Sequence, residues 1–145
     1  MNLRPATIDD CWTLADSLRS KDLQELSLVA DGASPLDKAL RAWAGSEVCE
    51  AFETDAGQLV CVWGVQRFPG RLGSIWMLGT PRIEEVPLSF LRACRPVIAR
   101  ASAGFDVLGC APWRENALHL RWLSWLGFTP RDTGHPVFLP HYLHV

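Results

Sequence analysis

The stretch from residue 106 to residue 128 constrains the fold more than any other, because it reads as a strand, a turn and an amphipathic helix in succession. Its first apolar run, Val-Leu-Gly-Cys-Ala, is typical of a buried strand, and Pro112 ends that run because proline has no amide hydrogen to donate. The helix is predicted to begin near Glu115 or Asn116, since an asparagine side chain accepts hydrogen bonds from first-turn amides. Gly127 should end it, because glycine closes a helix in the left-handed conformation without steric cost. The apolar positions at helical spacing are Leu120, Leu123 and Phe128, with Trp122 or Leu126.

The middle of the chain predicts a three-stranded antiparallel meander. Residues 47–53 alternate between apolar and polar, and the segment Thr-Asp-Ala-Gly after them is a hairpin turn. A second strand follows over 58–68, and a turn at Pro69-Gly70 leads to a third over 73–78. The second strand is apolar on both faces, so we expect helices to cover both sides of the sheet.

Helices and short outer strands are predicted on either side of this meander. Residues 2–7 form a short edge strand, because Pro5 is tolerated only where its position in the ladder is unpaired. In the C-terminal tail, Pro140 separates two predicted strands. Helices are expected at about 10–19, 20–29, 35–45 and 87–103, the last kinked near Pro96, and tail strands at 136–139 and 142–145.

The helix after Asn116 carries a spaced motif. Asn116 precedes His119 by three residues, Leu123 by seven and the Gly127-Phe128 pair by eleven. This spacing resembles the one that GNAT-fold acetyltransferases use after their fifth strand, with two changes. His119 replaces the usual alanine, and Leu123 stands where those enzymes carry the tyrosine that protonates the departing thiolate of coenzyme A. With Arg121 added, Asn-x-x-His-x-Arg-x-Leu-x-x-x-Gly resembles the internal virion protein A family of short-tailed bacteriophages, a GNAT-like group.

This resemblance implies a fold and a setting. The fold would be α/β, a GNAT-like mixed, mostly antiparallel sheet flanked by helices on both faces, forming a single domain over residues 1–145. A V-shaped opening would separate the strands at 73–79 and 106–111. The partners would be other phage structural proteins or further copies of this chain. The resemblance places the protein in the virion or the host cytoplasm, and because the N-terminus lacks the apolar core of a signal peptide we expect that it is not secreted.

The segment from Thr80 to Pro87 departs from what an acetyl-CoA enzyme requires. Such enzymes place a glycine-rich loop here, since free backbone amides at a helix N-terminus bind the pyrophosphate and glycines allow close approach. This segment is preceded by a single glycine, contains two prolines, and places Glu84 and Glu85 where an anion would bind. No cofactor is therefore expected. If the chain is an enzyme, acetyl-CoA is the cofactor implied, with contacts from Trp76, Leu78, Arg82, Asn116 and His119.

Catalysis would need a base for the amine and an acid for the thiolate. The candidate bases are Glu50 and His119, with Glu47 and Glu53 on the same strand as Glu50. For His119 we favour a structural role, as a partly buried histidine bonded to a carbonyl. The only tyrosine, Tyr142, lies outside the helix motif and cannot be its acid. The favoured function is a phage internal virion or assembly protein without catalysis, and the alternative is an active N-acetyltransferase acting on an amine of a protein or small molecule.

Composition excludes several other classes. The formal net charge is −2 with no basic block, so nucleic-acid binding is not indicated, and no apolar stretch is long enough to predict a membrane span. The five cysteines are odd in number and widely spaced, which indicates buried free thiols and no metal site. A third possibility is an interaction module that uses a tryptophan-rich face; the tryptophans concerned are Trp113, Trp122 and Trp125.

Overall fold

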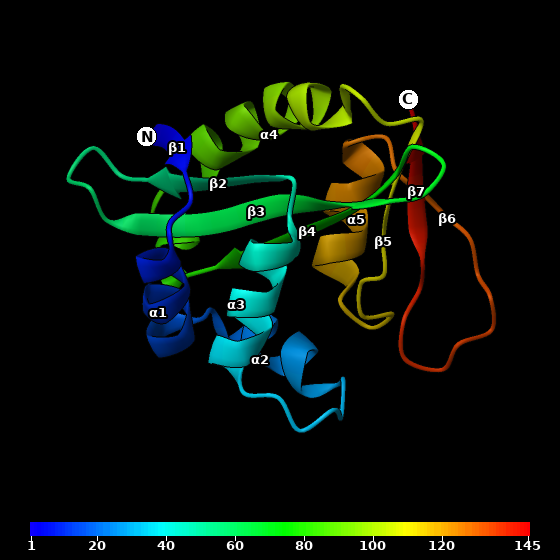
Figure 1. Cartoon of the computed structure of the whole chain (residues 1–145), viewed down its shortest axis with the longest axis horizontal. Helices are drawn as coiled ribbons and strands as arrows, with labels where there is room; N and C mark the ends of the chain where they lie inside the picture. The colour runs from blue at the N-terminus through cyan, green and yellow to red at the C-terminus, as the bar shows by residue number, and fades with distance from the viewer.

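One seven-stranded sheet runs through the computed structural model, which describes all residues 1–145, in the order β1-β2-β3-β4-β5-β7-β6 (Figure 1). Only the β4–β5 pair is parallel, so the prediction of a mixed, mostly antiparallel sheet is confirmed. The strands are β1 (Asn2–Pro5), β2 (Val48–Glu53), β3 (Leu59–Phe68), β4 (Leu72–Gly79), β5 (Val107–Cys110), β6 (Thr129–Pro130) and β7 (His141–His144). The helices are α1 (Ile8–Ser17), α2 (Ser20–Ser27), α3 (Pro35–Gly45), the 3-10 turn η1 (Pro81–Glu85), α4 (Pro87–Ser102) and α5 (Ala117–Trp125).

The predicted meander is the centre of this sheet. β2 pairs with β3 and β3 with β4, both antiparallel. The first seven residues of β3 are all buried, because helices cover both of its faces as its two-sided apolar sequence predicts. This strand therefore anchors two separate apolar layers.

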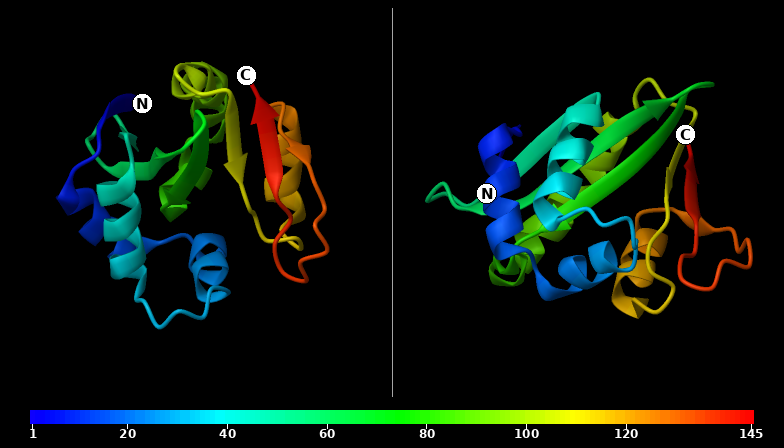
Figure 2. Two further views of the ribbon diagram at one scale, coloured as in Figure 1. Left: turned by 45° about the vertical axis from the view of Figure 1, so that its right-hand side comes forward. Right: turned by 60° about the horizontal axis from the view of Figure 1, so that its bottom comes forward.

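The two layers are formed by different helices (Figure 2). α1 and α3 pack on one face, where Cys11 and Leu14 of α1 meet Ala39 of α3. α4 and α5 pack on the other face, where Phe90 and Leu123 join the larger core. The prediction left Cys11 or Trp12 as the buried residue of the first helix, and it is the cysteine, with Trp12 54% exposed.

β4 and β5 run together for only three residue pairs, from Leu72 opposite Val107 to Ser74 opposite Gly109. Gly73 lies at this junction, and a Cβ there would come within 2.7 to 2.9 Å of three core side chains. The rest of β4, up to Gly79, has no strand partner on the β5 side. The opening predicted between these strands is therefore present, and it begins where the close packing around Gly73 ends.

The C-terminal tail differs from its prediction. β7 lies at His141–His144, within one residue of the strand expected at 142–145. It pairs with β5 on one side and with Thr129–Pro130 on the other. The strand expected at 136–139 is wrong, since Phe138 makes only an isolated bridge with Trp113. The amides of Val137 and Phe138 both donate to Nδ1 of His135, which leaves only the Leu139 amide to pair with the backbone of Pro112. Arg114 in addition binds the carbonyls of His135 and Phe138.

Prolines also occur at both outer strands. β1 and β6 are the edges of the sheet, and they end in Pro5 and Pro130. The prediction of an edge strand at the N-terminus is thus confirmed. α4 continues through Pro96, and no helix in the chain is both long and apolar enough to cross a membrane.

Candidate functional site

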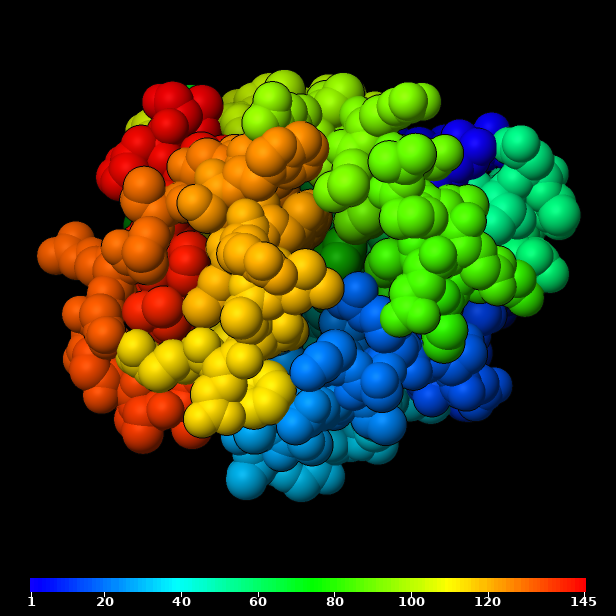
Figure 3. Space-filling model, turned by 180° about the vertical axis from the view of Figure 1, so that it is seen from behind, coloured from blue at the N-terminus to red at the C-terminus, as the bar shows by residue number.

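A groove of about 720 Å³ opens between α2 and the first turns of α4 and α5, at the place where β4 has separated from β5. Figure 3 shows this hollow, bounded by the blue α2, the green α4 and the orange α5. Met77 of β4 lies at its base, with Phe90 and Trp122 beside it. The opening between the diverging strands is thus accessible from outside.

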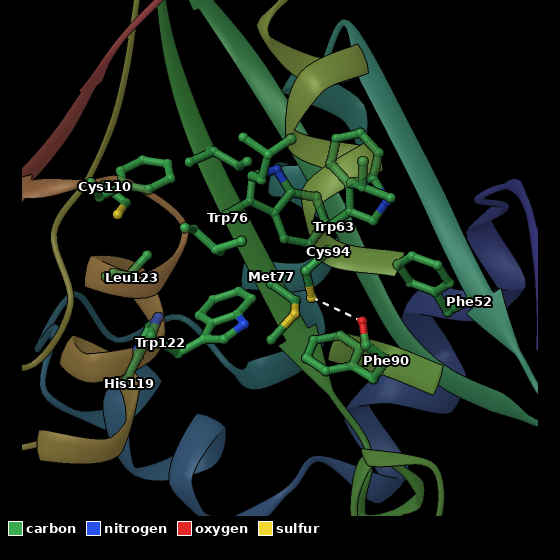
Figure 4. A pocket seen from close by; sticks show the side chains of 15 residues that line it. Phe52, Trp63, Trp76, Met77, Phe90, Cys94, Cys110, His119, Trp122 and Leu123 are labelled. Carbon is green, nitrogen blue, oxygen red and sulfur yellow. Dashed lines mark hydrogen bonds between the residues drawn. The ribbon is translucent and has the colours of Figure 1, made fainter. Parts of the chain in front are cut away.

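A smaller apolar cavity of about 90 Å³ adjoins the groove (Figure 4). Fourteen of its fifteen lining residues are hydrophobic, and it shares Met77, Phe90, His119 and Trp122 with the groove. The rings of Phe90 and Trp122 are stacked, with centroids 6.0 Å apart and planes 24° apart. This stack joins α4 to α5 across the space between the cavity and the groove.

Three polar side chains meet where the groove adjoins the cavity. Asn116 accepts the backbone N–H of His119 at 3.3 Å, which caps α5 as the sequence predicts. Its amide Nδ2 donates to Oε1 of Glu25 at 2.9 Å, and the same oxygen lies 3.4 Å from Nδ1 of His119. Burial opposes ionisation of Glu25, yet its contacts with His119 and Asn116 lower its pKa below the usual value. The cluster therefore joins α2 to α5 through an ionised carboxylate.

The prediction that His119 bonds a carbonyl is wrong, because its partner is this carboxylate. With Nδ1 directed at Glu25, the other ring nitrogen, Nε2, has no hydrogen-bond partner within the chain. A histidine oriented through one nitrogen by a carboxylate can exchange a proton through the other. The geometry is thus compatible with a general base at His119.

The unpaired edge of β4 has hydrogen-bonded backbone groups at its last residue, Gly79, and free ones before it. The amide of Gly79 donates to Oδ2 of Asp22 at 2.8 Å, and its carbonyl accepts the amide of Arg19 at 2.8 Å. Alternate residues of a strand turn their backbone groups to the same side, so those of Ile75 and Met77 face the opening. Burial raises the pKa of Asp22, and Arg19 opposes that effect.

The start of α4 offers few donors to an anion. Thr80 accepts the amide of Arg82 through its side chain and the amide of Ile83 through its carbonyl, and the amide of Val86 is bonded to Ile83. Pro87 has no amide hydrogen. Only Leu88 and Ser89 have backbone amides without a partner in the first turn of α4, and Glu84 and Glu85 precede them. The pyrophosphate of coenzyme A does not fit this surface, since its charge requires several converging donors.

The predicted cofactor contacts do not come together at the groove. Asn116 and His119 line it. Trp76 borders the smaller cavity, but its indole donates to Oγ of Ser46 at 2.8 Å and packs in the α1–α3 layer, where Leu78 is buried. Arg82 lies in a separate surface depression and pairs with Glu85 at 3.4 Å.

The predicted strand carboxylates are also away from the groove. Glu50 pairs with Arg100 at 3.3 Å, and neither residue lines the groove or the cavity. Each of the other two is held by an arginine in the same way, Glu47 by Arg67 and Glu53 by Arg4, both at 2.9 Å. Of the candidate bases, only His119 is at the opening.

Two residues at the site were not predicted. Met77 lies between the predicted contacts Trp76 and Leu78, and because strand side chains alternate, it alone of the three faces the groove. Glu25 contacts a residue 94 positions away, and nothing in the predicted helix at 20–29 marks it. All five cysteines are free as predicted, but only three are buried, since Cys49 and Cys110 are half-buried. No group of histidine, cysteine and acidic side chains could hold a metal.

Comparisons with known proteins bear on the fold. No family model and no curated protein sequence matches the chain. Solved structures do match. The GNAT domain of S. lividans PAT aligns with TM-score 0.75 at 12% identity, over 99% of this chain and 89% of that one. PaiA N-acetyltransferase from Thermoplasma acidophilum, in complex with coenzyme A, aligns with TM-score 0.68 at 12% identity, over 99% and 98%. The chain therefore has the GNAT fold.

Proposed function

We propose that this chain is an internal virion or virion-assembly protein of a bacteriophage, built on an acetyltransferase scaffold without catalysis. The GNAT fold supplies the scaffold, and fold alone does not determine activity. The motif from Asn116 to Gly127 supports the phage assignment through its resemblance to the internal virion protein A family. The protein would act in the particle or the host cytoplasm, in contact with other virion proteins or with further copies of itself.

The observation that carries this proposal is the first turn of α4. Leu88 and Ser89 supply two free amides where several are needed, and two carboxylates lie just before them. Arg82 pairs with Glu85 in a different depression, so it offsets that charge alone and leaves Glu84 without an ion-pair partner. A diphosphate at this surface would lose hydrogen bonds to water that the protein does not replace.

The other side of the opening supports the same conclusion. Leu123 replaces the tyrosine that the enzymes use as acid, and it is only 3% exposed, in the core. The stacked rings of Phe90 and Trp122 occupy the space between α4 and α5. Neither position supplies a proton donor to a leaving thiolate.

Titration calorimetry with acetyl-CoA, and separately with coenzyme A, tests whether the cofactor binds, on which catalysis would depend. We expect no saturable heat up to millimolar ligand. Micromolar binding of either compound would reject the proposal. The phage assignment is tested by mass spectrometry of purified particles, in which a virion component is present in a fixed ratio to the capsid protein.

An active N-acetyltransferase is the second candidate, and the pair of Glu25 and His119 favours it. Nε2 of His119 could accept a proton from an amine in the groove while Glu25 holds the ring through Nδ1. On this hypothesis His119→Ala abolishes turnover of an amine substrate. Glu50→Gln is the matched control and leaves turnover unchanged, because Glu50 does not line the groove. Wild-type protein without turnover on any amine would dismiss this candidate.

A further inference from the structure

The rim of the groove carries large apolar side chains that face solvent. Leu91 of α4 is 38% exposed, and Leu118 and Trp125 of α5 are 69% and 43% exposed. Leu118 and Trp125 are seven residues apart and so lie on one line along α5. An exposed apolar line beside a hollow is typical of a surface that binds another protein.

The same rim is positively charged. Lys21 and Arg121 both line the groove, and neither has a carboxylate partner. Arg95 lies beside the groove, over the ring of Trp125 at 4.2 Å, where it donates to the carbonyl of that residue and has no carboxylate partner. Glu115 is the one acidic residue among the groove's exposed lining positions. The groove therefore favours an acidic, apolar partner.

The outer face of α1 has the opposite character. Ile8 is 49% and Trp12 54% exposed, and their spacing of four residues places them on one line. Asp9 and Asp16 lie on the adjacent line, seven residues apart, and neither forms an ion pair. The outer face of α1 is thus acidic, and it carries an exposed apolar line formed by Ile8 and Trp12.

We propose that the outer face of α1 of one copy of this chain binds in the groove of a second copy. Trp12 and Ile8 would pack against Leu118 and Trp125, with Asp9 and Asp16 close to Lys21 and Arg121. No residue of α1 lines the groove of its own chain. The groove opens on the face shown in Figure 3, whereas α1 is at the front of the opposite view in Figure 1. The contact is therefore head-to-tail, and repeated contacts form a ring or a filament. This contact rests on the self-association that the proposed function includes and names its surfaces, while cofactor titration tests the absence of catalysis separately.

Sedimentation velocity of the full chain, from micromolar to near-millimolar concentration, measures the assembly. We expect the average mass to rise with concentration above the 16.1 kDa of one chain. Trp12→Ser should weaken association by more than about tenfold, since tryptophans are the usual anchors of protein interfaces. Phe68→Ser is the matched control, because Phe68 is similarly exposed at 50% but lies in neither surface. It should leave association unchanged.

Charge reversal tests the orientation of the contact. Asp9→Lys with Asp16→Lys, and separately Lys21→Glu with Arg121→Glu, should each prevent assembly, while a mixture of the two variants should assemble again. Circular dichroism verifies that both variants are folded. Wild-type protein that stays monomeric at near-millimolar concentration overturns the proposal. So does assembly that persists in Trp12→Ser, or a mixture that fails to assemble.

Discussion

Replacement of Glu25 by glutamine removes a charge from the junction of α2 and α5 while keeping the shape of the side chain. The glutamine oxygen can still accept the amide of Asn116, which lies 2.9 Å from Oε1 of Glu25. The contact with His119 loses its charge, and a hydrogen bond to a charged group contributes about 1.5–3 kcal/mol. The Glu25 side chain is 20% exposed, so we expect a loss of about 1–2 kcal/mol in the free energy of unfolding at neutral pH.

The effect should depend on pH in a defined direction. The pKa of Glu25 is lower in the folded chain than its usual value, through His119 and Asn116 and despite burial. The folded state therefore binds fewer protons at this residue than the unfolded state, and stability rises with pH. The contribution is fully present above the unfolded pKa of about 4.5 and is lost as the pH falls through the folded value. The difference between wild type and Glu25→Gln should diminish over that range.

Urea unfolding followed by tryptophan fluorescence, at pH 7 and at pH values below about 4.5, measures this difference. A double-mutant cycle with His119→Ala isolates the pairwise term, because the two residues are in contact. Two results would refute the reasoning: an equal loss at both pH values, or a coupling energy indistinguishable from zero. In the first case the loss would come from packing of the side chain and not from its charge.

Three further predictions concern other parts of the fold. Gly73→Ala should cost about 1–3 kcal/mol by urea unfolding, since its Cβ would overlap the side chains of Val65, Phe105 and Leu108. Gly45→Ala, whose Cβ meets only the mobile amide end of Gln66, is its control and should cost far less; equal costs would contradict the close packing at the start of the opening. Burial raises the pKa of Cys94 to about 11, so this thiol should react with Ellman's reagent at pH 8 only as fast as the chain unfolds, and prompt labelling would disprove its burial. Arg114→Ala removes the contacts to Asp132 and to the carbonyls of His135 and Phe138, so limited proteolysis between residues 131 and 139 should become faster while the rest of the chain remains resistant.

The sequence was informative wherever structure is determined locally. Asn116 as a cap, Gly127 as a stop and the two-sided apolar pattern of β3 are effects of neighbouring residues, and all three are confirmed. The meander and the helices of both faces followed from the same kind of pattern. In the tail the last strand was predicted within one residue, whereas the strand expected at 136–139 is absent and the partner of β7 is Thr129–Pro130, a pairing between distant residues that no local pattern marks.

The candidate site was harder to predict, because its residues meet across the chain. The motif on α5 led to Asn116 and His119, but their common partner on α2 has no local signal. The positions predicted on β4 were displaced by one residue, and on a strand one residue exchanges the two faces. Trp76 and Leu78 therefore pack in the α1–α3 layer and do not line the groove, although Trp76 borders the adjoining cavity, and Met77 is the strand side chain that lines the groove.

The two outer strands of the sheet limit how copies of this chain can join. An unprotected edge invites another strand to extend a sheet from one molecule into the next. Here the edge strands β1 and β6 have four and two residues, and each ends in a proline that cannot donate a hydrogen bond to an added strand. Continuous sheets across molecules are thereby disfavoured, so that at high protein concentration copies of this chain should meet through their helical surfaces without forming fibrils.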